Sequence, residues 1–278
     1  MITLSAFADE ISPKLEEAVA VLKECGIKLM DLRGFDGVNV LKLSDDQVKY
    51  AKGVLKREGI GVAAIASPIG KVEVTDAFEP QAGSMKRALE MAKAFDCRHV
   101  RIFSFYMPKS SAAPSHKQWK KEVIDRMGKL ARMAEGTGVK VTLENEEGLY
   151  GDTTERAVEI IDALNLPYLT LAWDPCNLVI IGPKPYTDSF KLARKHLGYL
   201  HVKDWSRERH EVVPAGQGDA EWPAIVRGIK ETGYSGIVSL EPHLSAAGQF
   251  SGFTGPGLFR KAHGALSALL KEAGLEYN

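Results

Sequence analysis

The chain has 278 residues, enough for one large α/β domain, and its 36 Lys and Arg residues balance 36 Asp and Glu residues. A formal net charge of zero argues against a protein that its overall field holds on nucleic acid or on an anionic membrane. No apolar run approaches the roughly 20 residues of a membrane helix, the N-terminus lacks a signal-peptide pattern, and the cysteines form no C-x-x-C pair. We therefore expect a cytoplasmic protein with reduced thiols and with neither nucleic acid nor membrane as a partner.

Short apolar runs alternate with longer amphipathic segments along the whole chain, which predicts alternating strands and helices. The expected strands, in chain order, are residues 2–8, 27–32, 62–66, 99–103, 140–144, 169–174, 199–203 and 237–241. The expected helices are residues 13–24, 45–58, 80–95, 117–135, 154–164, 188–196, 221–231 and 257–273. In most of these units a glycine stands between the helix and the next strand, as αβ connections are built.

Polar residues mark several of the expected helix starts. Ser12 stands before Pro13, which predicts a helix with the serine as its cap and the proline in its first turn. Ser44 is the expected cap of the second helix, and Thr153 or Thr154 that of the fifth.

Eight strand–helix units in a chain of this length are typical of a (β/α)8 barrel, whose usual size is about 250 residues. The alternative is an open doubly wound sheet, but the first strand–helix turn lacks G-x-G-x-x-G and no glycine cluster marks a switch point. We find no linker or low-complexity segment, so we expect a single α/β TIM-barrel domain over residues 1–278. The two longest connections, residues 107–115 and 179–187, would then lie on the face that carries the active site.

Polar side chains stand at the ends of four of the apolar strands. Glu144, Asp174 and Glu241 each end a strand, and His201 lies near the end of the strand between the last two. Since the active site of such a barrel lies at the carboxyl ends of its strands, these four side chains should face one another. Beneath a crowded site we expect small residues on the same face of each strand. The positions two residues before the three acids hold such residues: Thr142, Ala172 and Ser239. Tyr199, two residues before His201, is the exception.

Three converging carboxylates would repel one another, and one would have to stay protonated unless a cation lay between them. Three oxygen donors and one imidazole suit Mn²⁺, Mg²⁺ or Co²⁺ with open water positions, and Zn²⁺ remains an option. We therefore expect one divalent metal ion. Four unrelated polar residues at solvated strand ends are the competing explanation.

Further candidates lie near the same strand ends. Lys203 follows His201 by two residues, so both should face the pocket, where a lysine needs a charged partner. We expect Lys203 to bind a substrate oxygen or to take part in acid–base chemistry. His243, Arg33 and Lys71 are expected to bind substrate, although an exposed loop position would explain each of them equally well.

Several motifs resemble one known family. They are L-E-N-E-E-G-L-Y-G-D-T from Leu143, W-D-P-C-N from Trp173, H-V-K-D from His201, V-P-A-G-Q-G-D from Val213 and S-L-E-P-H from Ser239. Over essentially its whole length the chain resembles the sugar phosphate isomerase/epimerase superfamily of xylose isomerase-like TIM barrels. F-A-D-E-I-S near the start and S-P-I-G-K after the third strand are similar to one sugar-epimerase-like subgroup.

The resemblance implies a ligand set of one residue from each of four successive strands. Many members carry a histidine shortly after the aspartate, whereas this chain has Asn177, which we count as a substrate-binding candidate. Glu146 is an alternative to Glu144 as the ligand, or else binds substrate. The DNA-repair branch of the same barrel uses several more histidines than this chain offers. The implied metal ligands are Glu144, Asp174, His201 and Glu241.

The sequence therefore predicts a metal-dependent isomerase or epimerase of a keto-sugar or related polyol. Glu144 and Glu241 would remove and return a proton beside a carbonyl, through an enediolate, with Lys203 as a further catalytic candidate. A lyase or dehydratase on a cyclic keto-acid or keto-sugar needs the same first step and is the first alternative. A non-catalytic, metal-containing sugar-binding barrel is the second. The partner would be a small sugar-like molecule, and a homo-oligomer is compatible with the sequence.

Overall fold

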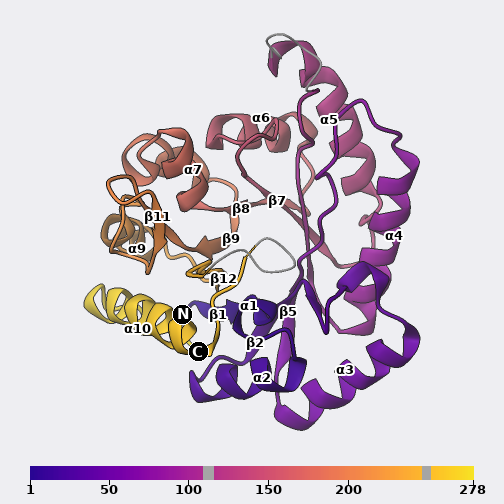
Figure 1. The fold of residues 1–278 in the computed structure, drawn as a ribbon. Coiled ribbons are helices and arrows are strands. Elements are labelled where there is room, and N and C mark those ends of the chain that lie inside the picture. The colour runs from indigo at the N-terminus through magenta and orange to yellow at the C-terminus, as the bar shows by residue number, and fades with distance from the viewer. Residues whose placement is uncertain (109–115, 246–251) are drawn as a thin grey trace.

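Eight parallel strands form the centre of the molecule (Figure 1). The computed structural model describes residues 1–108, 116–245 and 252–278. Around the ring the strands follow the order β1-β12-β9-β8-β7-β6-β5-β2, and a bridge between Phe7 and Asp31 links the two end strands. The predicted single-domain (β/α)8 barrel is therefore confirmed. The strands are β1 (Thr3–Ala6), β2 (Leu29–Leu32), β5 (Gly61–Ile65), β6 (His99–Ile102), β7 (Lys140–Glu144), β8 (Leu169–Trp173), β9 (Leu197–Val202) and β12 (Ile237–Leu240).

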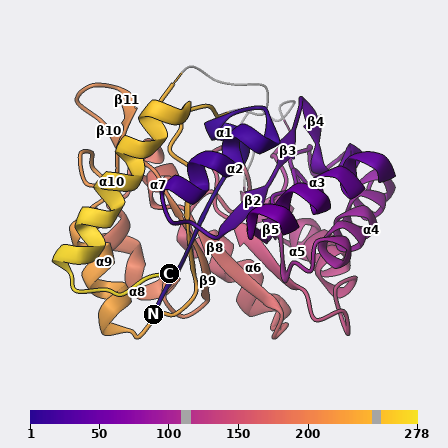
Figure 2. The same ribbon diagram turned by 90° about the horizontal axis from the view of Figure 1, so that it is seen from below.

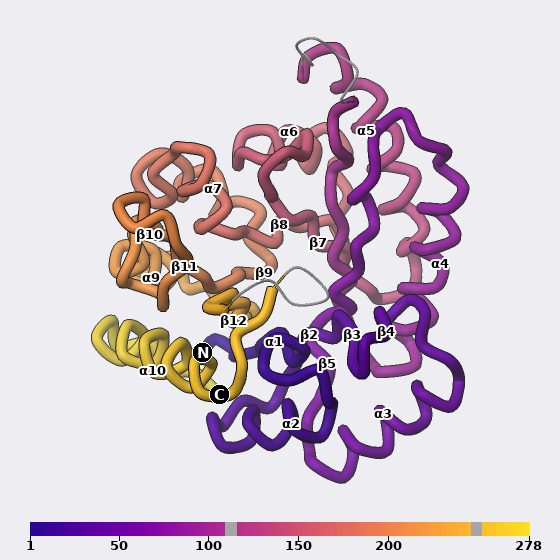
Figure 3. The backbone as a smooth tube through the Cα atoms, viewed as in Figure 1, coloured from indigo at the N-terminus to yellow at the C-terminus, as the bar shows by residue number. Residues whose placement is uncertain are grey.

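Helices surround the barrel, and the chain winds once around it from the indigo to the yellow end (Figure 3). The two termini lie close together in both ribbon views (Figures 1 and 2), where the Leu4 amide donates to the Asn278 carbonyl at 3.1 Å. No helix in the described ranges has the length and apolar character needed to cross a membrane. The outer helices are α2 (Leu15–Glu24), α3 (Asp45–Glu58), α4 (Glu79–Ala94), α5 (His116–Arg132), α6 (Thr154–Leu164), α8 (Lys191–Ala193), α9 (Trp222–Glu231) and α10 (Pro256–Glu272).

Two of the predicted helix starts are confirmed. The Ser44 side chain accepts from the Gln47 amide and the Gln47 side chain accepts from the Ser44 amide, which is a capping box at the start of α3. The Thr153 side chain accepts from the Arg156 amide and so caps α6. Both caps satisfy amides that have no partner within the helix.

The predicted start of the first helix is wrong. A short helix, α1 (Ala8–Ile11), follows β1, and α2 begins only at Leu15 after the chain has turned through Pro13. Ser12 donates instead to the Glu17 carboxylate at 2.7 Å. Proline fits the first turn of a helix, but it fits a turn equally well, so the sequence pattern could not separate the two.

The segment between β8 and β9 is also more helical than predicted. The expected loop over residues 179–187 is wrong, because Asp174 and Pro175 start a helix directly after β8. The other long connection, predicted at residues 107–115, lies outside the described residues from 109 onward. The helical elements before β9 are α7 (Pro175–Ile181), the π-helix η2 (Pro185–Phe190) and α8.

Two short hairpins lie outside the barrel sheet and were not predicted. β3 (Gly34–Phe35) pairs with β4 (Val38–Asn39), and the short helix η1 (Val40–Lys42) follows. β10 (Asp204–Ser206) pairs with β11 (Glu211–Val213). Their strands are too short to give a clear alternating pattern in the sequence.

Candidate metal and substrate site

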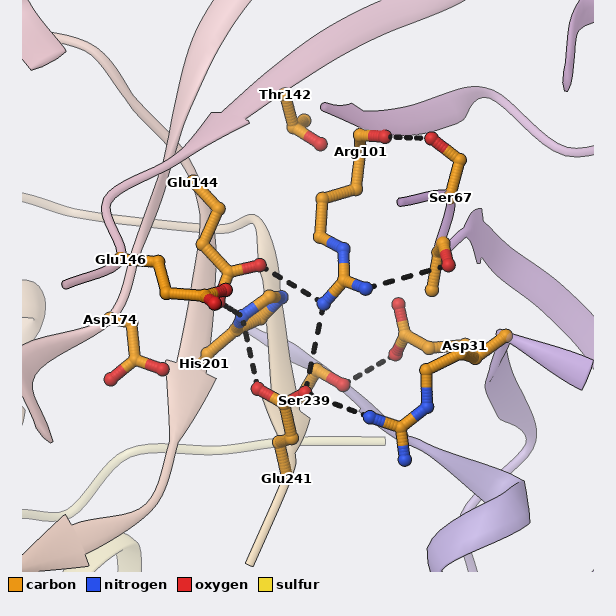
Figure 4. A network of polar contacts seen from close by, with 12 residues as sticks. Asp31, Ser67, Arg101, Thr142, Glu144, Glu146, Asp174, His201, Ser239 and Glu241 are labelled. Carbon is orange, nitrogen blue, oxygen red and sulfur yellow. Dashed lines mark hydrogen bonds and ion pairs between the residues drawn. The ribbon is translucent and has the colours of Figure 1, made fainter. Parts of the chain in front are cut away.

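The four strand-end residues meet at one end of the barrel. Glu144 is the last residue of β7 and His201 lies in β9, while Asp174 and Glu241 directly follow β8 and β12. One donor atom from each of the four lies within 4.8 Å of the others, and all four side chains are buried. Figure 4 shows them converging from their separate strands. We call these four residues the acidic cluster.

Asp174 is held in place by hydrogen bonds from Asn145 and Asn177. Its amide donates to Asn145 Oδ1 and its carbonyl accepts from Asn145 Nδ2, both at 2.9 Å. Its carboxylate accepts from the Asn177 amide at 3.1 Å, while Asn177 Nδ2 donates to the Asn145 carbonyl at 2.8 Å. Asn177 thus also holds the turn that carries Asp174. The sequence prediction missed Asn145, whose one sign is an amide within the acids of L-E-N-E-E-G.

Two guanidinium groups lie beside the acidic cluster (Figure 4). Arg101 Nη1 is 3.0 Å from Glu144 and 3.6 Å from Glu241. Arg33 Nη1 is 3.5 Å from Glu241. Both guanidinium groups also lie over the Phe7 ring, 5.0 and 5.1 Å from its centroid. Opposite charges attract strongly in such a buried setting, so the arginines orient the carboxylates. Arg33 was predicted here; Arg101, in mid-strand, was not among the predicted site residues.

Lys203 supplies a third buried positive charge. Its Nζ lies 2.8 Å from Asp174 and 3.6 Å from Glu241. Burial lowers the pKa of the Lys203 ammonium, but these two carboxylates outweigh burial and hold the pKa well above its usual value. Lys203 is therefore charged at neutral pH and balances part of the cluster's negative charge.

The three carboxyl groups of the cluster titrate differently. Burial raises the pKa of each, but His201 and the adjacent guanidinium outweigh this at Glu144 and lower its pKa to about 2. At Glu241, Lys203 and the neighbouring imidazoles hold the pKa well below its usual value. At Asp174 burial outweighs Lys203, so the pKa is raised. Glu144 and Glu241 are thus ionised at neutral pH.

The donor atoms of the cluster fit a divalent cation. Asp174 Oδ2, His201 Nδ1 and Glu241 Oε2 are buried and make ion-pair contacts, but none has a hydrogen-bond partner in the described structure. Buried polar atoms normally have such a partner, so three exceptions in one cluster need an explanation. A cation between them would supply it, and three carboxylates with one imidazole suit Mg²⁺, Mn²⁺ or Co²⁺.

Glu146, the alternative to Glu144, lies outside the acidic cluster. Its carboxylate forms an ion pair with Lys71 at 2.7 Å. Lys71 follows Gly70, which has a φ of +91° and whose added Cβ would lie 2.0 Å from the Phe103 carbonyl. A side chain cannot fit there, so the glycine of S-P-I-G-K allows the turn to press against the end of β6. The turn thereby brings Lys71 to the pocket.

A cavity of about 1000 Å³ opens beside the cluster. Glu144, Glu241 and Lys203 line it, whereas Asp174 and His201 are buried outside its lining. The structure therefore places every predicted substrate-binding residue at one cavity. These residues are Arg33, Lys71, Glu146, Asn177 and His243.

The short helix α1 supplies two buried acids that the sequence prediction missed. Asp9 accepts from Arg33 Nε at 2.7 Å. Glu10 lies 2.9 Å from His243 Nε2 and also accepts from the His243 amide at 2.9 Å. Burial lowers the pKa of His243, but Glu10 and Glu241 outweigh it and raise the pKa to about 9. The acids of F-A-D-E-I-S therefore hold Arg33 and His243 at the cavity.

The family model described as xylose isomerase-like TIM barrel matches residues 19–268. The chain therefore belongs to this family, in agreement with the barrel fold. An uncharacterized protein of Methanocaldococcus jannaschii is 23% identical over 165 residues, which is 56% of this chain and 55% of that protein. The match thus spans about half the length of this curated relative.

Solved structures of similar fold include several enzymes. A D-tagatose 3-epimerase-like protein has a TM-score of 0.78 at 17% identity, covering 98% of both chains. A probable 3-DHS dehydratase from Bacillus anthracis, AsbF, has a TM-score of 0.74 at 16% identity, covering 96% of this chain and 99% of that one. A xylose isomerase-like TIM barrel protein from Mycobacterium smegmatis, in complex with magnesium, has a TM-score of 0.66 at 18% identity, covering 98% and 97%. At these identities the similarity is one of fold.

Proposed function

We propose that the protein is a divalent-metal-dependent isomerase or epimerase of a keto-sugar or related polyol. The observation that carries the proposal is the acidic cluster itself, with buried donor atoms that have no hydrogen-bond partner beside a cavity of about 1000 Å³. Epimerases among the proteins of similar fold support the proposed reaction class. The residues that would hold the cation are Glu144, Asp174, His201 and Glu241.

A divalent cation bound there would polarise a substrate carbonyl and make the adjacent C–H more acidic. Glu144 and Glu241 line the cavity from β7 and β12, strands that β8 and β9 separate in the sheet. A substrate between them would meet one carboxylate on each side. One carboxylate would remove the proton beside the carbonyl and the other would return it, which inverts a centre or moves the carbonyl. Both are ionised at neutral pH and can accept a proton.

The cationic side chains have a complementary task. Lys203, charged and next to Glu241, would donate a hydrogen bond to a substrate oxygen on which negative charge develops. Arg33 and Arg101 keep Glu144 and Glu241 oriented toward the cavity. Because these partners are buried and ion-paired, little reorganisation is needed when charge moves.

A dehydratase acting on a cyclic keto-acid is the second candidate, and His243 is the observation that favours it. Its imidazole lines the cavity 3.6 Å from Glu241, and its pKa of about 9 keeps it protonated at neutral pH. After Glu241 removed a proton beside the carbonyl, His243 would protonate a departing hydroxyl. An enzyme that only epimerises needs no such donor.

Solvent-deuterium exchange over a panel of ketoses tests the proposal, with protein loaded with Mg²⁺ or Mn²⁺. We expect deuterium next to the carbonyl of at least one ketose. Glu241→Gln should reduce the exchange rate by about 10²–10⁴-fold at saturating metal, which is the contribution of a typical general base. Glu155→Gln makes the same change at an exposed position on α6 and should leave the rate unchanged.

Loss of water from the substrate, with no deuterium incorporated beside the carbonyl of the remaining substrate, would favour the dehydratase. Metal-loaded protein that exchanges no proton with any ketose or keto-acid, yet binds sugars, would instead indicate the non-catalytic sugar-binding barrel.

A further inference from the structure

The cavity extends well beyond the acidic cluster. Its inner end lies at the strand ends, and its outer end lies between the β4–η1 segment and α4. At about 1000 Å³ the cavity is at the upper end of the range for small-molecule sites. It therefore has room for more than the reacting carbons of a sugar. The lining residues from the outer end are Asn39, Leu41, Lys42, Pro80, Gly83, Ser84 and Arg87.

The charged residues that line the cavity are unevenly distributed. Six lysines and arginines and four glutamates are among them. Three further carboxylates, of Asp9, Glu10 and Asp174, contact the cations of the inner end from behind the lining. The charges of the two ends therefore have to be considered separately.

The positive charges of the inner end are already compensated. Arg33 contacts three carboxylates, and Arg101 and Lys203 contact two each. Lys71 is paired with Glu146. These side chains balance the acids of the site, so the inner end has no surplus of positive charge.

In the described parts of the chain, the outer end has cations but no acid in its lining. Lys42 is exposed and makes no ion pair or hydrogen bond with any described residue, and none of the outer-end residues named above is acidic. Arg87 Nη2 donates to the carbonyl of Leu43 at 2.7 Å, the residue next to Lys42. Its one carboxylate partner is Glu90, at 3.2 Å and half exposed. The hydrogen bond thus holds the Arg87 guanidinium beside the segment that carries Lys42, and both cations line the same end of the cavity.

We infer that the outer end of the cavity binds an anionic group of the substrate, remote from the carbons that react at the acidic cluster. The group is a phosphate ester or a carboxylate, both of which lysine and arginine bind through charge-assisted hydrogen bonds. This inference rests on the proposed function for the position of the reacting end. It predicts that the substrate is an acidic or phosphorylated ketose rather than a neutral one.

Calorimetric titration of Mg²⁺-loaded protein with D-fructose, D-fructose 6-phosphate and D-fructuronate tests the inference. We expect at least one of the two anionic ligands to bind about tenfold or more tightly than D-fructose, with an advantage that falls as salt rises. The tighter of the two identifies phosphate or carboxylate as the preferred group. Equal dissociation constants for all three ligands would overturn the inference.

Two variants locate the subsite. Lys42→Ala should weaken binding of the preferred anion about five- to tenfold and leave the affinity for D-fructose unchanged. Ser84→Asp places an acid one helical turn from Arg87 and should have a larger effect of the same sign. Lys49→Ala, an exposed lysine of α3 outside the cavity, is the matched control and should change neither affinity. An equal loss for neutral and anionic ligands in Lys42→Ala would contradict the subsite.

The outcome is separable from that of the proposed function. An anion preference that Lys42→Ala removes supports the subsite even if no ligand exchanges deuterium, a result that would count against the reaction alone. Exchange of D-fructose with the same efficiency as its anionic analogues would support the reaction and overturn the subsite.

Discussion

Asp31 is a buried carboxylate inside the barrel, 1% exposed and surrounded by hydroxyl groups. Ser5 donates to it at 2.7 Å, and Ser239 and Tyr199 donate as well. Burial raises the pKa of Asp31, although these hydrogen bonds oppose the shift. A buried carboxylate is tolerated only where hydrogen-bond donors surround it. The hydroxyl groups of these strands therefore stabilise Asp31 together. Tyr199, which broke the pattern of small residues, is one of the donors.

We expect Tyr199→Phe to lower the free energy of unfolding by about 1–3 kcal/mol, because it leaves a buried carboxylate with one donor fewer. Urea denaturation followed by circular dichroism measures this. Tyr168→Phe is the control, since the Tyr168 hydroxyl is buried and has no hydrogen-bond partner among the described residues, so its removal should be nearly neutral. Equal losses in the two variants would show that the Asp31 contact contributes nothing.

At the scale of the element, β9 shows how alternation places the site. His201 and Val202 are neighbours, 2% and 1% exposed, but only His201 joins the acidic cluster. Tyr199, two residues before His201, shares its side of the strand and lies with its ring 5.6 Å from the imidazole. Adjacent strand residues point to opposite faces. His201 and Val202 are therefore equally buried but have different surroundings.

His201→Ala should weaken binding of Mg²⁺ or Mn²⁺ strongly, because it removes the one imidazole of the donor set. Val202→Ala should leave metal affinity unchanged and reduce stability by roughly 0.5–3 kcal/mol, as other core truncations do. Metal titration calorimetry and thermal unfolding of both variants measure the two effects. If Val202→Ala released metal and His201→Ala did not, the proposed ligand set would be wrong.

At the scale of the whole molecule, the acidic cluster sits above a barrel that has its own apolar core. Most of the buried hydrophobic side chains lie between the strands and the outer helices, away from the cluster. Three basic side chains already balance much of the cluster's charge. We therefore expect the fold to persist without a metal ion, as it would if the cluster were a catalytic rather than a structural site.

Protein purified without chelator should contain about one divalent ion per chain, and EDTA should remove it. The far-ultraviolet circular dichroism spectrum should persist after chelation, with the melting temperature lowered only by the loss of ligand binding. Elemental analysis and thermal unfolding before and after EDTA check this. Absence of stoichiometric metal would refute the metal site, and unfolding on chelation would favour a structural ion.

The barrel and its acidic cluster could be predicted because both depend on periodicity. Buried parallel strands are short apolar runs, so a polar residue such as Glu144 or Glu241 at the end of one is conspicuous. The topology then requires these ends to lie on one face. The choice between Glu144 and Glu146 could not be made in this way, because both have the same strand parity. The structure distinguishes them, because Glu144 belongs to the acidic cluster, whereas Glu146 forms an ion pair with Lys71.

The sequence by itself determined the order of the barrel strands and the main helices, the family resemblance and the four residues of the cluster. Each of these depends on the spacing of residues that lie near one another in the chain. The tertiary structure alone decided which charges meet. Asp9 reaches Arg33 because β1 lies next to β2, and Glu10 reaches His243 because β1 pairs with β12. Arg101 reaches Glu144 because β6 pairs with β7. Such contacts join residues far apart in the chain, and no local pattern encodes them. Those contacts also set the distribution of charge along the cavity, which is paired at the inner end, whereas Lys42 at the outer end has no ion-pair partner among the described residues.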